Sequence, residues 1–590
     1  MRKPIVALVA LTMATSAVAN GYYFAPDVSG LETPVDLSVP GNWHKHGKGG
    51  DAQTDLEFLT SQSDRSYLYG LENRITLPEN TILTAWELKF GLGNGDSENI
   101  VFDLPSSSGL KISGFFSSTF RDVTAYPDAR TDIRWESGSF EVTGSSFINV
   151  ANAGSLVFTG ANTSLKNVKM NQPKSGTRYA IENGASWTGG SLVTDQTEDS
   201  FGNEFGASGS TLTDVSFKLS KLSHDNCWSF TNHVVFAGTT SFSVDGVRNK
   251  LVFGETGYQF AANALALYGE ECAFEFGPGS EIASANGYAF IGGTDNRFVF
   301  AGPSTSWSGS GCILRMNGSG GTVAVSNGVT FAAKGIEIGN GASNCTFEAV
   351  GKDTSVTLNG DWFKIGIGGN GTGERVLLAD GATMTVPHIM YGNGGVCSGS
   401  RFEIRDGASV SSASGLQLNC MTGGGNALVV DNGSLTLAKE FKSQSGGGYA
   451  AGPDSLTIGG TNGTVSLLRI SADERLDFIM SIPKEGRAPG SAALAFTCND
   501  PAYTAFYGLN LCRLNLDIDE KWARKGGDVH ADLVSIPKAT RDAATQLQTL
   551  ANTVPADSLG KCTLSVVETE THQVLRLTAG PRRGLAILIR

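Results

Sequence analysis

One short sequence motif, here called the phrase, recurs along this chain, and few folds can accommodate such a repeat. It reads RVLLADGATMTV at 375–386, RFEIRDGASVSS at 401–412 and ALVVDNGSLTL at 427–437. In each copy an alternating apolar run leads into a glycine, at Gly381, Gly407 and Gly433, and a second alternating run follows. Alternation with a period of two predicts β-strands, and Asp-Gly or Asn-Gly predicts a sharp turn with positive φ.

The phrase extends well beyond these three copies. Weaker versions run from Gly160 to Gly460, and the twelve intervals between them average about 25 residues. A four-stranded propeller blade would need roughly 40–45 residues, whereas this period suits one coil of a β-helix. We therefore predict an all-β fold, a right-handed parallel β-helix, in which Phe402 and Ile404 point inward while Arg401 and Glu403 point outward.

The two ends of the chain differ from its middle. Arg2 and Lys3, an apolar run as far as Met13 and an A-x-A site before Asn20 are typical of a secretory signal peptide. No later segment reaches the ~18 apolar residues of a membrane-spanning helix, so we expect a soluble, exported mature chain. The expected organisation is a signal peptide at 1–19, an N-terminal cap and first coils at 20–150, the β-helix repeat domain at 151–470, and a small C-terminal α+β or β cap module at 471–590 with one amphipathic helix at 539–552.

The net charge and the number of cysteines limit which binding partners and which disulfides are expected. The chain carries a formal net charge of -13, which disfavours nucleic acid and anionic membranes as partners. Its nine cysteines are an odd number, so at least one thiol is free or paired with another chain. Cys498 and Cys512, on either side of an expected hairpin, are the best candidates for a disulfide; two buried, unpaired thiols are the alternative.

The DGA phrases behind a signal peptide resemble the β-helical passenger repeats of bacterial autotransporters and related surface adhesins. The resemblance covers roughly 150–470 and implies a secreted or cell-surface protein. Autotransporters end in a translocator barrel much longer than the ~120 residues that follow the repeats here, and such barrels typically end in an aromatic residue, whereas this chain ends in Arg590. The resemblance therefore does not extend to self-translocation, and we expect release, or attachment by another route.

A β-helix is also the frame of many polysaccharide lyases and glycosidases. Glycoside hydrolysis needs two carboxylates that face one bond. The galacturonase-like β-helix enzymes carry NTD, DD and GHG signatures, and this chain has neither an Asp-Asp pair nor GHG. Its nearest approach is GTDNRF at 293–298, where Asp295 and Arg297 either face a groove or form a polar corner.

Several other residue groups suggest chemistry, but each also has a structural interpretation. They are His224, Cys227 and His233 as metal ligands; His44 and His46 on one loop; Asp380, Asp406 and Asn432 as a cation-binding column or as turn residues; Arg375 and Arg401 one period apart on a solvated face; and Trp187 and Trp307 as sugar-stacking or core residues. The structural interpretation is the simpler one in every case. We therefore predict no catalytic, cofactor-binding or metal-binding residues and no cofactor.

Two functional hypotheses follow from these observations. The first is a secreted or cell-surface β-solenoid with a non-catalytic adhesive or structural role, which binds glycan or protein along its face. The alternative is an extracellular carbohydrate-active β-helix enzyme, either a polysaccharide lyase or a glycoside hydrolase. The first is favoured because the strand repeats are clear in the sequence, whereas no set of catalytic residues can be identified in it.

Overall fold

The structure is a computed structural model of the 590-residue chain. The residues that it describes are 21–26, 30–45, 50–62, 65–68, 72–90, 98–118, 130–144, 148–149, 154–172, 176–194, 199–255, 257–260, 264–284, 287–360, 362–367, 370–392, 396–420, 422–445, 453–526 and 529–580. They form two compact units, unit 1 (residues 1–180 and 184–190) and unit 2 (residues 181–183 and 191–590).

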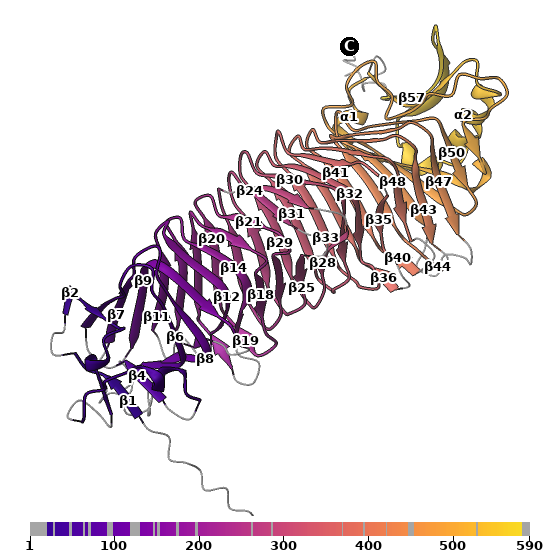
Figure 1. Cartoon of the computed structure of the whole chain (residues 1–590). Coiled ribbons are helices and arrows are strands. Elements are labelled where there is room, and N and C mark those ends of the chain that lie inside the picture. Colours follow the sequence, from indigo (N-terminus) through magenta and orange to yellow (C-terminus); the bar gives the residue numbers. More distant parts are fainter. Residues whose placement is uncertain are drawn as a thin grey trace, which may run out of the picture. The chain divides into compact units, whose positions relative to one another are not determined.

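The chain is 58% strand and 6% helix, and its strands form a parallel β-solenoid of about 14 turns with coils around 25 residues apart. This confirms the all-β, β-helical fold that the repeat predicts. Figure 1 shows the ladders of stacked strands, with the coils of unit 2 coloured from magenta to orange. In unit 2 each coil contributes one strand to each of three parallel ladders, here called face 1, face 2 and face 3.

Face 1 of unit 2 holds the strands that precede the glycine turn. They are β16 (Glu204–Ser208), β20 (Cys227–Thr231), β23 (Lys250–Phe253), β26 (Ala273–Phe276), β29 (Arg297–Ala301), β31 (Thr322–Ser326), β33 (Thr346–Val350), β37 (Arg375–Ala379), β41 (Arg401–Arg405), β45 (Ala427–Asp431), β48 (Asp454–Gly459), β51 (Leu476–Ile482) and β54 (Cys512–Ile518). Parallel pairing carries on past residue 470, because β51 pairs with β48 and then with β54.

Face 2 holds the strands that follow the glycine turn, and face 3 the strands after the next bend. Face 2 comprises β17 (Thr211–Thr213), β21 (Val235–Ala237), β24 (Gly257–Phe260), β27 (Glu281–Ser284), the first halves of β30 (Ser306–Met316) and β32 (Thr330–Ile338), β34 (Ser355–Leu358), β38 (Thr383–Val386), β42 (Ser409–Ser412), β46 (Ser434–Leu437), β49 (Thr464–Leu467), β52 (Leu494–Phe496) and β55 (His530–Pro537). Face 3 comprises β18 (Ser216–Leu219), β22 (Ser241–Val244), β25 (Leu265–Leu267), β28 (Gly287–Ile291), the second halves of β30 and β32, β35 (Phe363–Ile365), β39 (Ile389–Tyr391), β43 (Leu416–Cys420), β47 (Glu440–Ser445), β50 (Arg469–Ala472) and β53 (Phe506–Tyr507).

Unit 1 is built from longer strands in the same parallel manner, apart from an antiparallel pair at its start. Its strands are β1 (Gly21–Phe24), β2 (Gly30–Asp36), β3 (Trp43–Lys45), β4 (Arg65–Leu68), β5 (Glu72–Thr76), β6 (Ile82–Phe90), β7 (Glu98–Asp103), β8 (Gly109–Ser118), β9 (Thr131–Val142), β10 (Ile148–Asn149), β11 (Ser155–Thr159) and β12 (Thr163–Gln172). β13 (Arg178–Glu182) and β14 (Ser186–Thr194) follow. Small strands at the bends are β15 (Ser200–Phe201), β19 (Ser223–His224), β36 (Asn370–Thr372), β40 (Val396–Ser398) and β44 (Thr422–Gly424).

The core of unit 2 is a set of side-chain columns that run from coil to coil. Phe402 and Ile404 of β41 are both fully buried, as the alternation predicts. In earlier coils the same columns hold stacked rings: Phe253, Phe276 and Phe300 have successive centroid distances of 4.8 Å at interplanar angles of 15° and 5°. Each such pair adds roughly 0.5–1.5 kcal/mol beyond the area that it buries. One coil buries little by itself, and the stack forms the core.

The glycine turns between face 1 and face 2 have the conformation that the repeat predicts in two of the three best copies. Gly407 has φ of 81°, and Asp406 before it has φ of 50°. Gly433 is the exception, because its φ is not positive although that of Asn432 is 53°. A Cβ on Gly433 would lie 2.7 Å from the carbonyl oxygen of Ile404. Glycine is therefore required at position 433 because the backbone of the neighbouring coil lies too close for a side chain, and not because φ is positive.

We expect Gly407→Val to destabilise the coil around β41 by on the order of 1–3 kcal/mol, because a β-branched residue is strained at positive φ. Crowding does not contribute, since a Cβ on Gly407 would meet no atom within 4 Å. Gly257→Val is the matched control: that position is equally open, but its φ is not positive. Thermal unfolding should show a lower midpoint for the Gly407 variant alone, and equal midpoints would contradict the strain.

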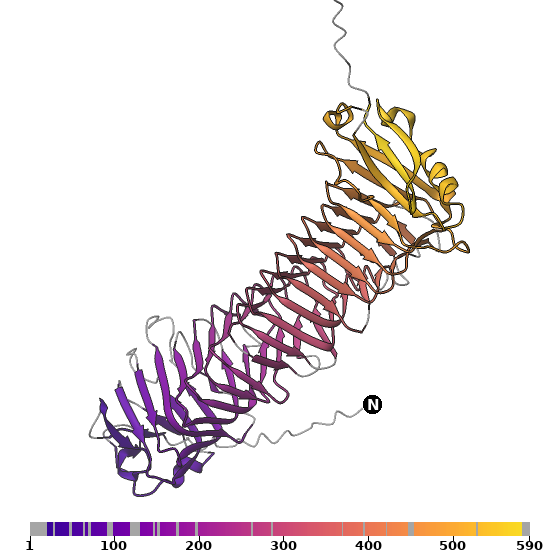
Figure 2. The same ribbon diagram turned by 90° about the horizontal axis from the view of Figure 1, so that it is seen from above.

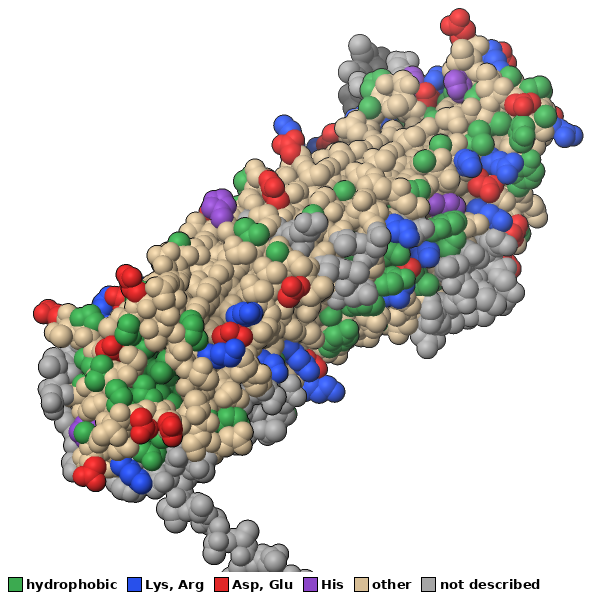
Figure 3. Space-filling model, in the orientation of Figure 1, with side chains coloured by type: hydrophobic (Ala, Val, Ile, Leu, Met, Phe, Trp, Pro, Cys, Tyr) green, Lys and Arg blue, Asp and Glu red, His purple; other side chains and the backbone are tan. Residues whose placement is uncertain are grey.

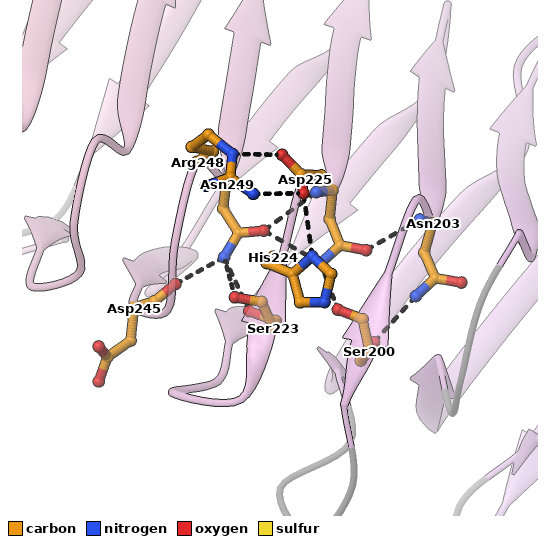
Figure 4. A network of polar contacts seen from close by, with 9 residues as sticks. Ser200, Asn203, Ser223, His224, Asp225, Asp245, Arg248 and Asn249 are labelled. Carbon is orange, nitrogen blue, oxygen red and sulfur yellow. Dashed lines mark hydrogen bonds and ion pairs between the residues drawn. The ribbon is translucent and has the colours of Figure 1, made fainter.

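A ladder of buried polar side chains lines the corner between face 3 and face 1. The backbone N–H of Asn203 donates to Oδ1 of Asn226 (2.8 Å), and the N–H of Asn226 donates to Oδ1 of Asn249 (3.0 Å). Figure 4 shows this network together with Ser200 and Ser223. Later coils place Asn296, Glu374, Ser400, Asn426 and Asp454 at equivalent positions, all buried. From Asn226 onward each of these side chains accepts from a backbone N–H of the preceding coil, a donor that would otherwise be buried without a partner.

The C-terminal region adds helix and antiparallel pairing to the last coils. α2 (Ala543–Ala551) lies within the predicted amphipathic helix and packs against β57 (His572–Thr578), which pairs in antiparallel fashion with β55 and β56 (Thr563–Glu568) (Figure 2). A short helix, α1 (Glu520–Ala523), and four 3-10 turns, η1 (Pro40–Asn42), η2 (Glu57–Thr60), η3 (Leu509–Leu511) and η4 (Ala556–Leu559), complete the described elements.

The expected disulfide between Cys498 and Cys512 is wrong. Both residues are free, buried thiols. The hairpin that the prediction assumed is not formed, since β52 pairs in parallel with β49 and β55 on face 2. Cys512 begins β54, which pairs in parallel with β51 on face 1.

Candidate binding face

The tryptophans that could have stacked on sugar rings are core residues. Trp187 is fully buried and Trp307 is 1% exposed, and the ring of Trp307 stacks on that of Phe331 with centroids 5.8 Å apart. The structural interpretation of both residues is therefore confirmed.

The histidine and cysteine group does not converge on a metal site. His224 stacks on Phe201 and its Nδ1 lies 2.9 Å from Asp225 Oδ2, while Cys227 and His233 are exposed on and after β20. Within the described residues no three His, Cys, Asp or Glu side chains are grouped so that they could hold a metal ion. His44 lies in β3, and His46 lies outside the described residues.

The aspartates of the repeat are corner residues. Asp295 has φ of 54°, and the next residue, Asn296, is a member of the polar ladder. Arg297 begins β29 and is exposed, without an ion pair to Asp295 in the described part of the chain. Asp380 and Asp406 also have positive φ, at 54° and 50°, on exposed turns. These positions supply turn geometry, as the structural interpretation predicts.

Glu403 departs from expectation. It points outward, but it is only 4% exposed because Arg375, Arg401 and Arg405 cover it. The outward direction is the one that the alternation predicts, but the side chain is buried under the three arginines. Arg375 and Arg401, expected to be merely stacked on a solvated face, are brought together by this carboxylate.

A polar column on face 3 of unit 2 is the feature that sequence reasoning missed. Register places its members side by side on neighbouring strands, about 4.8 Å apart. The polar members are Arg315, Glu337, Lys364, Gln417 and Lys442, and the buried Met390 occupies the position between Lys364 and Gln417. No signal within one repeat could identify the column, because each coil contributes a different residue type at this position.

Two cations share one carboxylate at the start of the polar column. Arg315 Nε lies 2.6 Å from Glu337 Oε2, and Lys364 Nζ lies 3.5 Å from Glu337 Oε1. Asn340 also donates to Glu337 Oε2, at 3.3 Å. Glu337 is 7% exposed, so its charge is held close to the two cations and this end of the column keeps a positive excess.

Aromatic rings flank the polar column. The guanidinium carbon of Arg315 lies 4.0 Å from the centroid of the Tyr288 ring, a cation–π geometry. The rings of Trp362 and His388 have centroids 4.0 Å apart. Figure 3 shows basic and hydrophobic side chains gathered together over β35, β43 and β47. Planar rings beside hydrogen-bonding groups form a surface suited to sugars, which have apolar faces and hydroxyl edges.

A shallow hollow of about 130 Å³ lies beside the column. His388, Gln417, Lys439 and Glu440 contribute its polar groups. Burial, together with the nearby charge of Lys439, lowers the pKa of His388 and so favours the uncharged imidazole. Among the residues that the structure describes, Nε2 of His388 has no hydrogen-bond partner. The hollow therefore offers a neutral hydrogen-bonding ring beside one cation and one anion.

A larger hollow of about 540 Å³ lies between the last coils and the C-terminal strands of unit 2. Hydroxyl side chains line much of it, and its one carboxylate, Asp532, is paired with Arg576 at 2.7 and 3.2 Å. Each of these two described hollows thus contains a single carboxylate. Neither presents the pair that glycoside hydrolysis requires.

No protein-family model matches the chain, and a search of curated proteins finds no significant match. Within the described residues no helix is long and apolar enough to cross a membrane.

Proposed function

We propose that this protein is a secreted or cell-surface β-solenoid with a non-catalytic, adhesive role, and that it binds a glycan along face 3 of unit 2. The observation that carries the proposal is the polar column with its flanking rings. Its spacing of about 4.8 Å per coil is close to the length of one sugar unit, so successive coils meet successive units of a linear glycan. The signal-peptide pattern at 1–19 supports export.

Binding to a panel of immobilised polysaccharides tests this proposal. We expect at least one polysaccharide to retain the protein, and Lys364→Ala with Lys442→Ala to weaken that retention at least tenfold. Lys364 and Lys442 lie three coils apart, so the double variant removes hydrogen-bonding cations from two separate glycan positions. It reduces affinity without disturbing the core, since both side chains point outward.

Lys250→Ala with Arg297→Ala is the charge-matched control, because both residues lie on face 1. Equal weakening in the control, or none in either variant, would refute face 3 as the binding surface. New reducing or unsaturated ends in the polysaccharide would show that the protein is an enzyme instead.

A further inference from the structure

Face 1 of unit 2 carries an arginine cluster, formed by Arg375, Arg401 and Arg405 around Glu403. Arg375 on β37 is the register partner of Arg401 on β41, and Arg401, Glu403 and Arg405 alternate along β41. Arg405 Nε lies 2.7 Å from Glu403 Oε2, Arg375 Nη2 lies 3.8 Å from the same oxygen, and Arg401 Nε contacts Oε1.

The cluster has more positive charge than its one carboxylate neutralises. Three guanidinium groups contact Glu403, which leaves an excess of two positive charges at one place in an acidic chain. Asp431 is the register partner of Arg405, and Glu348 that of Leu377. Among the described residues, neither carboxylate forms an ion pair with the three arginines. The excess is therefore not cancelled by contact.

Glu403 holds the arginines in place rather than merely pairing with them. Its register neighbours are apolar, Leu377 on one side and Val429 on the other, and its side chain is only 6% exposed. The arginine side chains remain 49%, 46% and 35% exposed. Each guanidinium has five N–H donors, and Glu403 uses only some of them. The remaining donors are oriented before any ligand arrives, which reduces the entropy that binding costs.

We propose that the arginine cluster binds an oxyanion, a carboxylate or sulfate group carried by an acidic polysaccharide. The planar guanidinium forks match the geometry of both groups and bind them by paired hydrogen bonds. The proposal rests on the proposed function for the carrier, a glycan, but it concerns a different face. The net charge of -13 repels nucleic acid, so the cluster selects an anion on a less densely charged polymer.

The test compares the full chain with the variant Arg375→Gln/Arg401→Gln, which keeps Arg405 as the partner of Glu403. Affinities are measured for polygalacturonate, which carries carboxylates, for dextran sulfate, which carries sulfates, and for neutral dextran. We expect the variant to bind at least one of the two acidic polymers at least tenfold more weakly than the wild type, and dextran to be unaffected. Binding to the acidic polymers should also weaken steeply with added salt.

Lys250→Gln/Arg297→Gln, which removes two charges from the same face, should leave these affinities within about twofold. Equal losses of affinity in the two variants, or tighter binding of duplex DNA than of either acidic polymer, would overturn the proposal.

A titration with galacturonate oligomers separates the proposal for the arginine cluster from the proposed adhesive function. If the wild type binds the oligomers and the variant does not, while neither polymer is retained, the result contradicts the proposed adhesive function and supports the arginine cluster as an anion site. If the polymers are retained and the arginine variant binds them unchanged, only the proposal for the arginine cluster is contradicted.

Discussion

Ile404→Asp is expected to open the coils around β41 while the coils before β31 stay folded. Ile404 is fully buried, and its register neighbours are Leu378 and Val430, which are also fully buried. A carboxylate placed in that column has no partner, and an uncompensated buried charge costs on the order of 3–5 kcal/mol. Coils of a solenoid contact only their neighbours, so the damage should remain local.

Limited proteolysis measures this effect directly. Cleavage of the Ile404→Asp variant should begin within 376–437, and 204–301 should stay protected. Ser411→Asp is the matched control, because Ser411 is exposed on β42 in the same coil, and the same charge there should cost within about half a kcal/mol. If both variants were cleaved alike, the inward register of β41 would be wrong.

Glu374→Gln is expected to stabilise the protein at pH 8 and to make little difference at pH 4. Glu374 is fully buried in the polar ladder, where the N–H of Cys345 donates to its Oε2 at 2.7 Å and its Oε1 has no hydrogen-bond partner among the described residues. Burial raises the pKa of Glu374 to about 7, against an ordinary value of 4.5, although the hydrogen bonds from Cys345 oppose this shift.

The raised pKa determines the direction of the pH effect. Below pH 4.5 the carboxyl is protonated in both the folded and the unfolded chain, so the folded state carries no penalty. As the pH rises from 4.5 to about 7 the unfolded chain loses this proton first, and stability falls by roughly 3 kcal/mol before levelling off. Glutamine does not ionise and removes this loss.

Unfolding of wild type and variant at pH 4, 6 and 8 tests the effect, since their difference cancels the other titrating groups. The variant's advantage should grow between pH 4.5 and 7 and stay constant above that. A difference that is the same at pH 4 and pH 8 would show that folding does not shift the pKa of Glu374.

The core residues can be predicted from the repeated motif because the alternation of inward and outward side chains lies within a single strand. Phe402 and Ile404 alternate with outward residues within one strand, and Asp406-Gly407 encodes its own turn. The polar ladder also had a local signal, since an asparagine stands directly before the apolar run in DNCWSF, RNKLVF, DNRFVF and GNALVV. The same signal is present in GTDNRF, whose Asn296 is a ladder residue at the corner.

The repeat, the strand periodicity and the inward side chains can be predicted from the sequence, because each depends on neighbours within a few residues. Which outward residues meet depends on how the coils stack. Arg375 reaches Glu403 across 28 positions of sequence, and the polar column draws one residue from each of several coils. Loops of different lengths separate those coils, so the side chains that become neighbours depend on the register of the stacked strands. Stacking also buries Glu403 and Glu374, whose surroundings come from other coils and cannot be read from a single repeat.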